Sequence, residues 1–303
     1  MSKHDIAVVG DINIDVIPEP ISEDLEIKQD GQIFLDNLVH RRGGQAANFA
    51  VKSSELGSDV VFQGKVGDDH HADFLEDHLE EKGVEARLSR SEDIDTGTTV
   101  VVPWEDGERF FLSHTDNNSK LEFSDCCLES MKNSEHLARR GVWFSEPMLR
   151  EGNKKLLRKA KEEGIETSID LHWDPHWNKE NGRADERRQH FFEALQHADF
   201  LLGNEEELKG LTKEDELEAA VEKVKKYGDP NVVVHRGPDG SSIFNGSERI
   251  DVPTEDVENP ENPTGTGDVY DAAFLNAWQN GSNLEEAGRK ATEHAVKHLK
   301  GLN

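Results

Sequence analysis

The sequence predicts an α/β fold, with a mainly parallel β-sheet covered by helices on both faces. Short apolar runs such as 6–9, 59–67 and 231–237 end at glycine or polar turns, as buried strands do. They alternate with segments of helical spacing, and this alternation is typical of parallel sheets, whose strands are joined by crossover helices. Ligands bind beyond the carboxyl ends of such strands, so residues at these ends are the candidate functional residues.

The predicted elements follow one another along the whole chain. Strands are expected within 6–9, 59–67, 141–147, 165–173, 198–207 and 231–237, and helices within 45–57, 70–83, 150–163, 185–197, 214–227 and 266–280. Two segments, about 13–42 and 92–116, interrupt this rhythm with short strands, the second around a hairpin turn at 105–107. We expect a single domain over residues 1–303, in which these two segments pair into a small separate sheet.

The composition is strongly acidic. The chain has 63 Asp and Glu residues against 35 Lys and Arg residues, and its formal charge is −28. The acidic residues are spread along the chain, so the whole surface repels nucleic acid and anionic membranes, and we exclude both as partners. Salt at about 1 M shortens the screening length to about 3 Å, which relieves such repulsion. The composition therefore suggests a halophilic source, with an ordinary acidic mesophilic protein as the alternative.

The cysteines and the apolar segments indicate the compartment. Cys126 and Cys127 are neighbours, which rarely form a disulfide, and this favours a reducing environment. No apolar run approaches the roughly 20 residues of a membrane span, and the first residues lack the apolar core of a signal peptide. We expect a cytoplasmic protein.

The stretch NPTGTGDVYDAAFL, at 262–275, places two glycines and an aspartate at the start of a predicted helix. The first turn of a helix has unpaired N–H groups and a partial positive charge, and glycines let a phosphate approach them. Gly265, Thr266 and Gly267 are therefore candidates for holding the charge of a transferring phosphoryl group, and Asp268 is a candidate general base. The alternative is a glycine-rich loop before a helix with an acidic first turn.

Two other phosphate-binding motifs do not match this stretch. A P-loop needs Lys followed by Ser or Thr after its last glycine, whereas Asp268 and Val269 follow here. A dinucleotide-binding fingerprint needs a third glycine at the position of Tyr270, and it belongs after the first strand rather than near the end of a chain.

Several further motifs accompany this junction in a fixed order. They are GDINID at 10–15, GGQAANFA at 43–50, TGTTVVVPWEDGERFF at 96–111, GNEEE at 203–207 and VVVHRGPDG at 232–240. Together with NPTGTGDVYDAAF they resemble the ribokinase-like, or phosphofructokinase-B type, family of sugar and nucleoside kinases over nearly the whole chain. The resemblance implies a three-layer α/β core, a β-sheet lid over a sugar, and the use of ATP and Mg²⁺.

The resemblance also implies roles for individual residues. Asp268 resembles the catalytic base, and Gly265, Thr266 and Gly267 the anion hole. Residues that resemble sugar-binding positions are Asn13, Asp15, Gly44, Asn48 and, at the end of the strand expected over 141–147, Glu146. Those that resemble nucleotide-binding positions are Asn204, His235, Gly237 and Gly240. Glu207, with Asn204, matches a motif that organises Mg²⁺ through water. Family members often dimerise through the lid, so a homodimer is one possibility here.

Two departures from the family pattern concern the substrate. His172 replaces an Asn, and Asp174 stands near the place of an Arg that binds acidic or phosphorylated substrates in some members, which favours a neutral substrate. Arg41, Arg42 and Arg109 instead offer positive charge, either as an anion clamp or as partners of surface carboxylates. We expect a kinase that phosphorylates a hydroxyl of a sugar. The alternatives are a nucleoside kinase, a sugar-phosphate kinase such as one for ribose 1-phosphate, and an inactive sugar-binding regulator.

Overall fold

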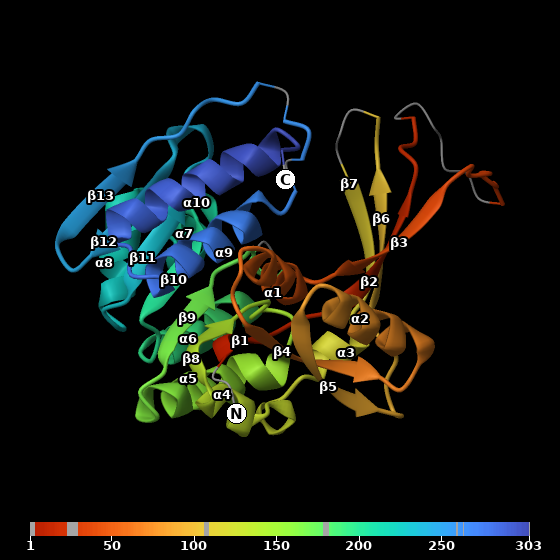
Figure 1. Cartoon of the computed structure of the whole chain (residues 1–303), viewed down its shortest axis with the longest axis horizontal. Coiled ribbons are helices and arrows are strands. Elements are labelled where there is room, and N and C mark those ends of the chain that lie inside the picture. The colour runs from red at the N-terminus through yellow and green to blue at the C-terminus, as the bar shows by residue number, and fades with distance from the viewer. Residues whose placement is uncertain are drawn as a thin grey trace.

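The computed structural model describes residues 4–22, 30–105, 109–177, 182–258, 260–262 and 264–302. These residues form a large and a small β-sheet, with helices packed on both faces of the large sheet (Figure 1). No helix in the described ranges has the length and apolar character that crossing a membrane would require.

The large sheet has the strand order β13-β12-β11-β10-β9-β8-β1-β4-β5. Its strands are β1 (His4–Val9), β4 (Val60–Gly67), β5 (Val84–Ser91), β8 (Ser134–Arg139), β9 (Glu166–Asp170), β10 (Phe200–Asn204), β11 (Asn231–His235), β12 (Ser241–Asn245) and β13 (Glu248–Val252). Neighbouring strands from β11 to β5 are parallel, and β12 and β13 form an antiparallel hairpin at one edge. Strands β1, β4, β10 and β11 are rich in apolar side chains because helices bury both of their faces, whereas the neighbouring β8 and β9 are more polar.

Helices on each face pack into a separate hydrophobic cluster. One face carries α1 (Gln45–Glu55), α2 (His70–Glu81), α9 (Thr266–Gln279) and α10 (Leu284–Leu299). The other carries α4 (Leu128–Lys132), α5 (Asn153–Glu162), α6 (Arg183–Leu195), α7 (Glu205–Thr212) and α8 (Leu217–Lys225), and the short α3 (Asp116–Ser119) contacts β4. The predicted three-layer α/β arrangement is confirmed.

The small sheet has the strand order β3-β2-β6-β7. Its strands are β2 (Asn13–Pro18), β3 (Leu38–Gly43), β6 (Thr98–Pro103) and β7 (Arg109–His114). The two insertions meet at its centre, where β2 runs parallel to β6 and Asp15 lies opposite Thr99. The prediction of a small separate sheet is confirmed, while the turn proposed at 105–107 lies partly outside the described residues.

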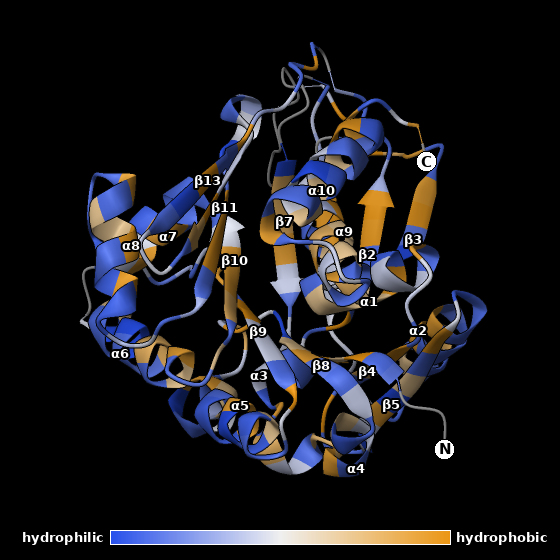
Figure 2. Cartoon of the chain, turned by 60° about the vertical axis from the view of Figure 1, so that its left-hand side comes forward, coloured by the Kyte–Doolittle hydropathy of each residue, from blue (hydrophilic) through white to orange (hydrophobic). Residues whose placement is uncertain are grey.

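The strands of the small sheet carry many hydrophobic residues (Figure 2), and several of their large apolar side chains are exposed. On β7, Phe110, Phe111 and Leu112 are each more than half exposed, and Phe34 and Leu38 are also exposed in the neighbouring insertion. An exposed apolar surface of this kind is typical of a face that meets a ligand or a partner.

The strand predicted over 141–147 is wrong. The strand is β8 at Ser134–Arg139, and residues 141–147 form turns that lead into a helical segment. The sequence of β8 is polar, but His136 is buried because its ring is within hydrogen-bond distance of Ser168 and Glu166 on the neighbouring β9. A strand whose buried polar groups are paired across the sheet does not appear in the sequence as an apolar run. The apolar pattern therefore favours the segment that follows β8 over β8 itself.

Candidate active site

The glycine-rich junction begins α9. Gly265 has φ 79°, a conformation that favours glycine, and its carbonyl accepts the N–H of Val269 at 3.0 Å. The N–H groups of Gly267 and Asp268 therefore have no acceptor within the helix. A Cβ on Gly267 would lie 3.6 Å from the ring of His235, so this residue marks a close approach between α9 and the end of β11.

The N-terminus of α9 lies between two cavities. Gly265 and Asp268 line a cavity of 250 Å³, which Asn48 of α1 and Arg42 of β3 also line. The other side faces a cavity of 360 Å³, lined by Thr266, Gly267, Tyr270, Asn204, His235, Gly237, Gly240, Thr254, Thr292, Ala295, Val296 and Leu299. One helix terminus can therefore contact two different ligands, one on each side.

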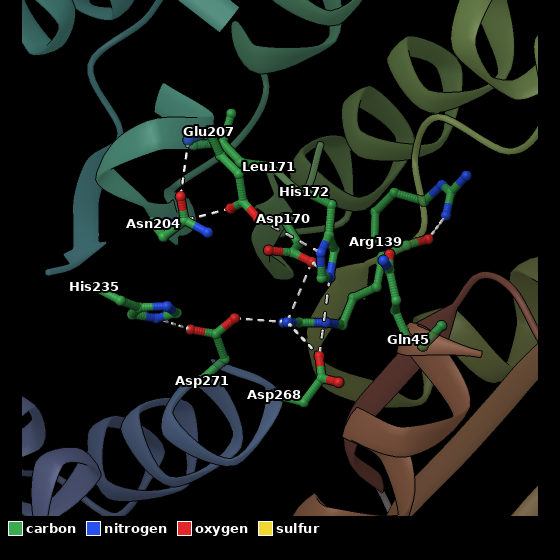
Figure 3. Close-up of polar contacts among 12 residues, drawn as sticks. Gln45, Arg139, Asp170, Leu171, His172, Asn204, Glu207, His235, Asp268 and Asp271 are labelled. Atoms are coloured by element: carbon green, nitrogen blue, oxygen red, sulfur yellow. Dashed lines mark hydrogen bonds and ion pairs between the residues drawn. The ribbon is translucent and has the colours of Figure 1, made fainter. Parts of the chain in front are cut away.

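Asp268 is a buried carboxylate, 9 % exposed. Its Oδ1 lies 3.4 Å from Nη2 of Arg140 and 4.0 Å from Nε2 of His172 (Figure 3). Burial raises the pKa of Asp268 to about 6, and the two cations oppose that rise. The group is therefore a carboxylate at neutral pH and a stronger proton acceptor than an exposed aspartate.

Arg140 follows the last residue of β8 and is almost completely buried. Its Nη2 lies 2.6 Å from Asp271 of α9 and 3.3 Å from Asp170 at the end of β9, besides its contact with Asp268. Burial alone would lower the pKa of Arg140, but the three carboxylates outweigh it and hold the pKa above its usual range. The guanidinium is a fixed positive charge among carboxylates that face it from α9 and β9.

His172 adds a second positive charge. It has φ 43°, and its Nε2 lies 2.6 Å from Asp170, while its Nδ1 lies 3.9 Å from Glu207. Burial opposes charging, but Asp170 dominates and raises the pKa of His172 to about 10. Burial likewise opposes the charge on Asp170, and Arg140 and His172 lower its pKa to about 2. At neutral pH the site therefore holds an imidazolium near Asp268.

His235 connects this charged group to the larger cavity. Its Nε2 is 2.7 Å from Oδ1 of Asp271, and its ring packs on Tyr270 with the centroids 4.6 Å apart. Burial would lower the pKa of His235, but Asp271 raises it. Gly237 and Gly240 follow β11 with φ values of 55° and 83°, so the chain turns sharply along the wall of the cavity.

Asn204 and Glu207 cap α7 reciprocally. The Glu207 N–H donates to Oδ1 of Asn204 at 2.8 Å, and the Asn204 N–H donates to Oε2 of Glu207 at 2.9 Å. Burial raises the pKa of Glu207 above its usual value, although His172 lowers it. One oxygen of this carboxylate is used by the cap, which leaves the other for a further partner.

The residues expected to bind a sugar come from β2 and from the start of α1. Nδ2 of Asn13 donates to Oδ1 of Asp15 at 2.7 Å, and burial raises the pKa of Asp15 to about 6. Gly44 has φ 99°, and a Cβ there would lie 2.6 Å from the carbonyl oxygen of Asp11, so a side chain does not fit. Asn48, one turn into α1, lines the 250 Å³ cavity beside Asp268.

Glu146 does not end a strand as expected. It lies seven residues beyond the end of β8, and its carboxylate pairs with Arg187 of α6 and with Arg150, at 3.4 Å. The carboxylate is therefore already engaged by arginines, and its proposed contact with a sugar stays a prediction without geometric support.

The arginines that the sequence offers as an anion clamp, Arg41, Arg42 and Arg109, differ in their surroundings. Arg41 is exposed on β3. Arg42 donates to the carbonyl of Ala47 at 2.7 Å, and its Nε is buried without a hydrogen-bond partner in the described part of the chain. Arg109, at the start of β7, contacts the hydroxyl of Thr264, so the small sheet reaches the loop that precedes α9.

Sequence reasoning did not identify Arg140 or Asp271 as site residues. Asp271 could have been noticed, because it is three residues after Asp268 and so lies on the same face of α9. The signal for Arg140 was a pair of arginines before Gly141, which the incorrect strand over 141–147 hid.

An α/β core whose helix terminus separates two cavities, with a buried carboxylate at the boundary, is the arrangement of an enzyme that joins two ligands. The profile described as pfkB family carbohydrate kinase matches residues 3–299. The chain therefore belongs to the pfkB family of carbohydrate kinases.

Individual relatives and solved structures agree with this assignment. A 5-dehydro-2-deoxygluconokinase of Clostridium perfringens is 25% identical, over 98% of this chain and 88% of the relative, and one of Mesomycoplasma hyopneumoniae is 26% identical, over 97% and 86%. The fold matches a PfkB protein from Polaromonas sp. with a TM-score of 0.84, 20% identity and coverage of 99% and 97%. It also matches ribokinase of Arabidopsis thaliana, complexed with ribose and ATP, with a TM-score of 0.79, 24% identity and coverage of 98% and 93%.

Proposed function

We propose that this carbohydrate kinase transfers the γ-phosphoryl group of ATP to a sugar hydroxyl, with Asp268 as the general base. The observation that carries the proposal is the place of the α9 N-terminus between the two cavities, with Asp268 lining one and Gly267 the other. A sugar in the 250 Å³ cavity and a nucleotide in the 360 Å³ cavity then meet at this terminus.

In the reaction, the ionised carboxylate of Asp268 accepts the proton of the substrate hydroxyl while that oxygen attacks the γ-phosphorus. A new O–P bond forms, the bond between the γ-phosphorus and the bridging oxygen breaks, and ADP leaves with the bond electrons. The N–H groups at the first turn of α9, over Gly265, Thr266, Gly267 and Asp268, stabilise the negative charge of the transferring group. Burial of the carboxylate favours this chemistry, because it raises the affinity of Asp268 for the proton.

The larger cavity suits a nucleotide. Ala295, Val296 and Leu299 of α10 give it an apolar wall for a base. Its other wall consists of polar or glycine residues that a phosphate chain can approach, namely Asn204, His235, Gly237, Gly240, Thr266 and Gly267.

The donor set fits Mg²⁺ that is held mainly by phosphates and water. In the part of the chain that the structure describes, no three His, Cys, Asp or Glu side chains form a group that could cage a metal. Mg²⁺ commonly keeps several waters and uses one or two carboxylates together with substrate phosphates. Glu207, which keeps one carboxylate oxygen outside its cap, and Asn204 would hold it through water. When bound, Mg²⁺ neutralises phosphate charge.

A sugar acid is the substrate class that we favour. Curated relatives of this chain are named 5-dehydro-2-deoxygluconokinase, and a gluconate derivative carries a carboxylate. Arg42 lines the same cavity as Asp268, and a guanidinium suits a carboxylate. A panel of 5-dehydro-2-deoxygluconate, 2-keto-3-deoxygluconate, ribose, fructose, adenosine, cytidine and ribose 1-phosphate separates this class from neutral sugars, nucleosides and sugar phosphates.

The Asp268→Asn variant tests the base. We expect kcat to fall about 10³-fold while the KM values for both substrates stay within about threefold, because the amide keeps the shape but cannot accept the proton. Asp73→Asn is the matched control, since Asp73 is an exposed acid in the first turn of α2, paired with Arg90, and it should leave kcat unchanged. Wild-type turnover by Asp268→Asn, with any substrate of the panel, would falsify the assignment.

A further inference from the structure

Arg140 is a buried charge for which the proposed reaction gives no role so far. We propose that Arg140 is a positioning residue, which keeps Asp268 ionised and directed at the sugar cavity. The proposal rests on the proposed function, because it assigns Arg140 a task only if Asp268 is the base.

The geometry of Arg140 is fixed from several sides. Its own N–H continues the sheet by donating to the carbonyl of Val9 at 3.0 Å, and its guanidinium lies 4.2 Å from the ring centroid of Phe49 on α1. The same Nη2 that approaches Asp268 at 3.4 Å lies 2.6 Å from Asp271 and 3.3 Å from Asp170. All three carboxylates contact this one Nη2, and Nε and Nη1 have no hydrogen-bond partner in the described part of the chain, so these ion pairs and the packing on Phe49 hold the guanidinium beside Asp268.

The contact also links the two cavities. His235 lines the nucleotide cavity and is within hydrogen-bond distance of Oδ1 of Asp271, whose Oδ2 accepts from Arg140. Asp268 lines the sugar cavity and contacts the same Nη2 of Arg140. Arg140 therefore contacts Asp268 of the sugar cavity directly and is linked to His235 of the nucleotide cavity through Asp271.

The charges around Asp268 decide which way the loss of Arg140 acts. Arg140 and His172 favour the ionised form, and Asp170 and Asp271 oppose it. The wall of the sugar cavity adds four further titratable or charged groups, Arg42, Lys52, Glu55 and His298. Arg140 is the cation closest to Asp268 in this set, so without it the pKa of Asp268 rises above about 6. Because the base acts in its ionised form, activity is then lost at a higher pH than in the wild type.

Arg139 provides a matched control. It is the preceding residue and is also fully buried, but it donates to Oδ1 of Asn153 at 2.6 Å and to the carbonyl of Val9 at 3.1 Å. Burial lowers the pKa of Arg139 to about 10, and its hydrogen bonds go to neutral acceptors, although Asp11 and Asp170 oppose that lowering. Arg139→Met therefore removes a buried guanidinium of equal size without removing a charge that faces Asp268.

The experiment is the pH dependence of kcat/KM between pH 5 and 9 for the wild type, Arg140→Met, Arg140→Lys and Arg139→Met. For Arg140→Met we expect the acid limb to move up by about one pH unit or more, so that the loss in kcat/KM is roughly twofold or more at pH 7 and grows to roughly tenfold at pH 5. Lysine should restore part of the shift, because it keeps the charge but reaches fewer acceptors. Arg139→Met should keep the apparent pKa of the wild type.

The outcomes separate the inference from the proposed function. If Asp268→Asn is inactive but Arg140→Met keeps the wild-type acid limb, or loses activity equally at every pH, Arg140 has only a structural role and the inference is overturned. If Asp268→Asn is active, the proposed base itself fails. Should circular dichroism show that Arg140→Met is unfolded, Arg140→Lys decides: an unchanged acid limb overturns the inference, and a limb shifted upward by roughly half a unit supports it.

Discussion

The carboxyl edge of the large sheet and the small sheet beside it distribute polarity in opposite ways. At the edge of the large sheet, Asp170, Asp268 and Asp271 are buried around Arg140. Figure 3 shows these three carboxylates converging from β9 and α9. On the small sheet, the aromatic residues of β7 are exposed. Stability alone would favour exposed charges and buried aromatic rings. Burial removes the hydration of a charge, and exposure leaves the apolar surface of a ring in water.

The difference shows what each region is built to meet. Buried carboxylates are tolerated at the sheet edge because cations pair with them. This pairing allows a reactive carboxylate oxygen to stay ionised in a site that is shielded from solvent. The apolar surface of the small sheet is not buried in its own core, which is typical of a surface that contacts a ligand or another chain. Arg109 joins the two regions through Thr264, directly before α9. Three substitutions test this comparison: one at the carboxyl edge of the large sheet, one at the boundary between the two regions and one on the small sheet.

Gly267→Ala tests the edge and should have the largest effect. An added Cβ would lie 3.6 Å from His235, an ordinary contact, so the folded state should accept it. The methyl group would however stand where a phosphate approaches the first turn of α9, and we expect kcat to fall by about 10²-fold. Steady-state kinetics measures the loss, and an unchanged melting temperature serves as the control. A variant with wild-type kcat would show that the phosphoryl group does not approach these amides.

Arg42→Gln tests the boundary, because Arg42 belongs to β3 of the small sheet and lines the cavity of Asp268. If Arg42 binds a substrate carboxylate, KM for a sugar acid should rise about tenfold, as expected for a lost charged hydrogen bond, while KM for a neutral sugar changes little. Arg41→Gln, at the exposed neighbouring position, is the control. An equal rise in KM for acidic and neutral sugars would instead mean that Arg42 only supports the cavity wall.

Phe111→Ser tests the small sheet and should have the smallest effect. We propose that the apolar surface of β7 pairs two copies of the chain. Because about half of the Phe111 side chain is exposed in one copy, its loss should weaken the dimer by about 1 kcal/mol. Light scattering coupled to size exclusion, over a dilution series, measures the change. Phe74→Ser on α2 is the control, and a wild-type chain that stays monomeric at high concentration contradicts the proposal.

Local features of the chain were predictable, and contacts between distant segments were not. The start of α9 and the place of Asp268 follow from the glycines and the helical spacing after them. Arg140 is 128 residues from Asp268 and 131 from Asp271, so its contacts depend on which strand lies next to which. The strand that directly precedes it is misplaced by the sequence pattern, because the apolar residues of 141–147 lie mostly in turns, while the polar β8 is buried and hydrogen-bonded to its neighbour.

Departures from the family pattern were visible, but their meaning was not. The sequence showed His172 in place of an Asn, yet only the structure gives its φ of 43° and its position between Asp170 and Glu207. The imidazolium that results depends on three carboxylates from β9, α7 and α9. Such a charge balance is a property of the packed elements rather than of any one segment.

The parallel pairing of β2 with β6 has a consequence for engineering this chain. These strands come from different insertions, and they share one ladder in which Ile14, Asp15 and Val16 lie opposite Thr98, Thr99 and Val100, more than 80 residues away in the sequence. If only one insertion were exchanged for that of another sugar kinase, in order to change the sugar specificity, β2 or β6 would lose the native strand with which it pairs. Both insertions behave as one part and have to be transplanted together.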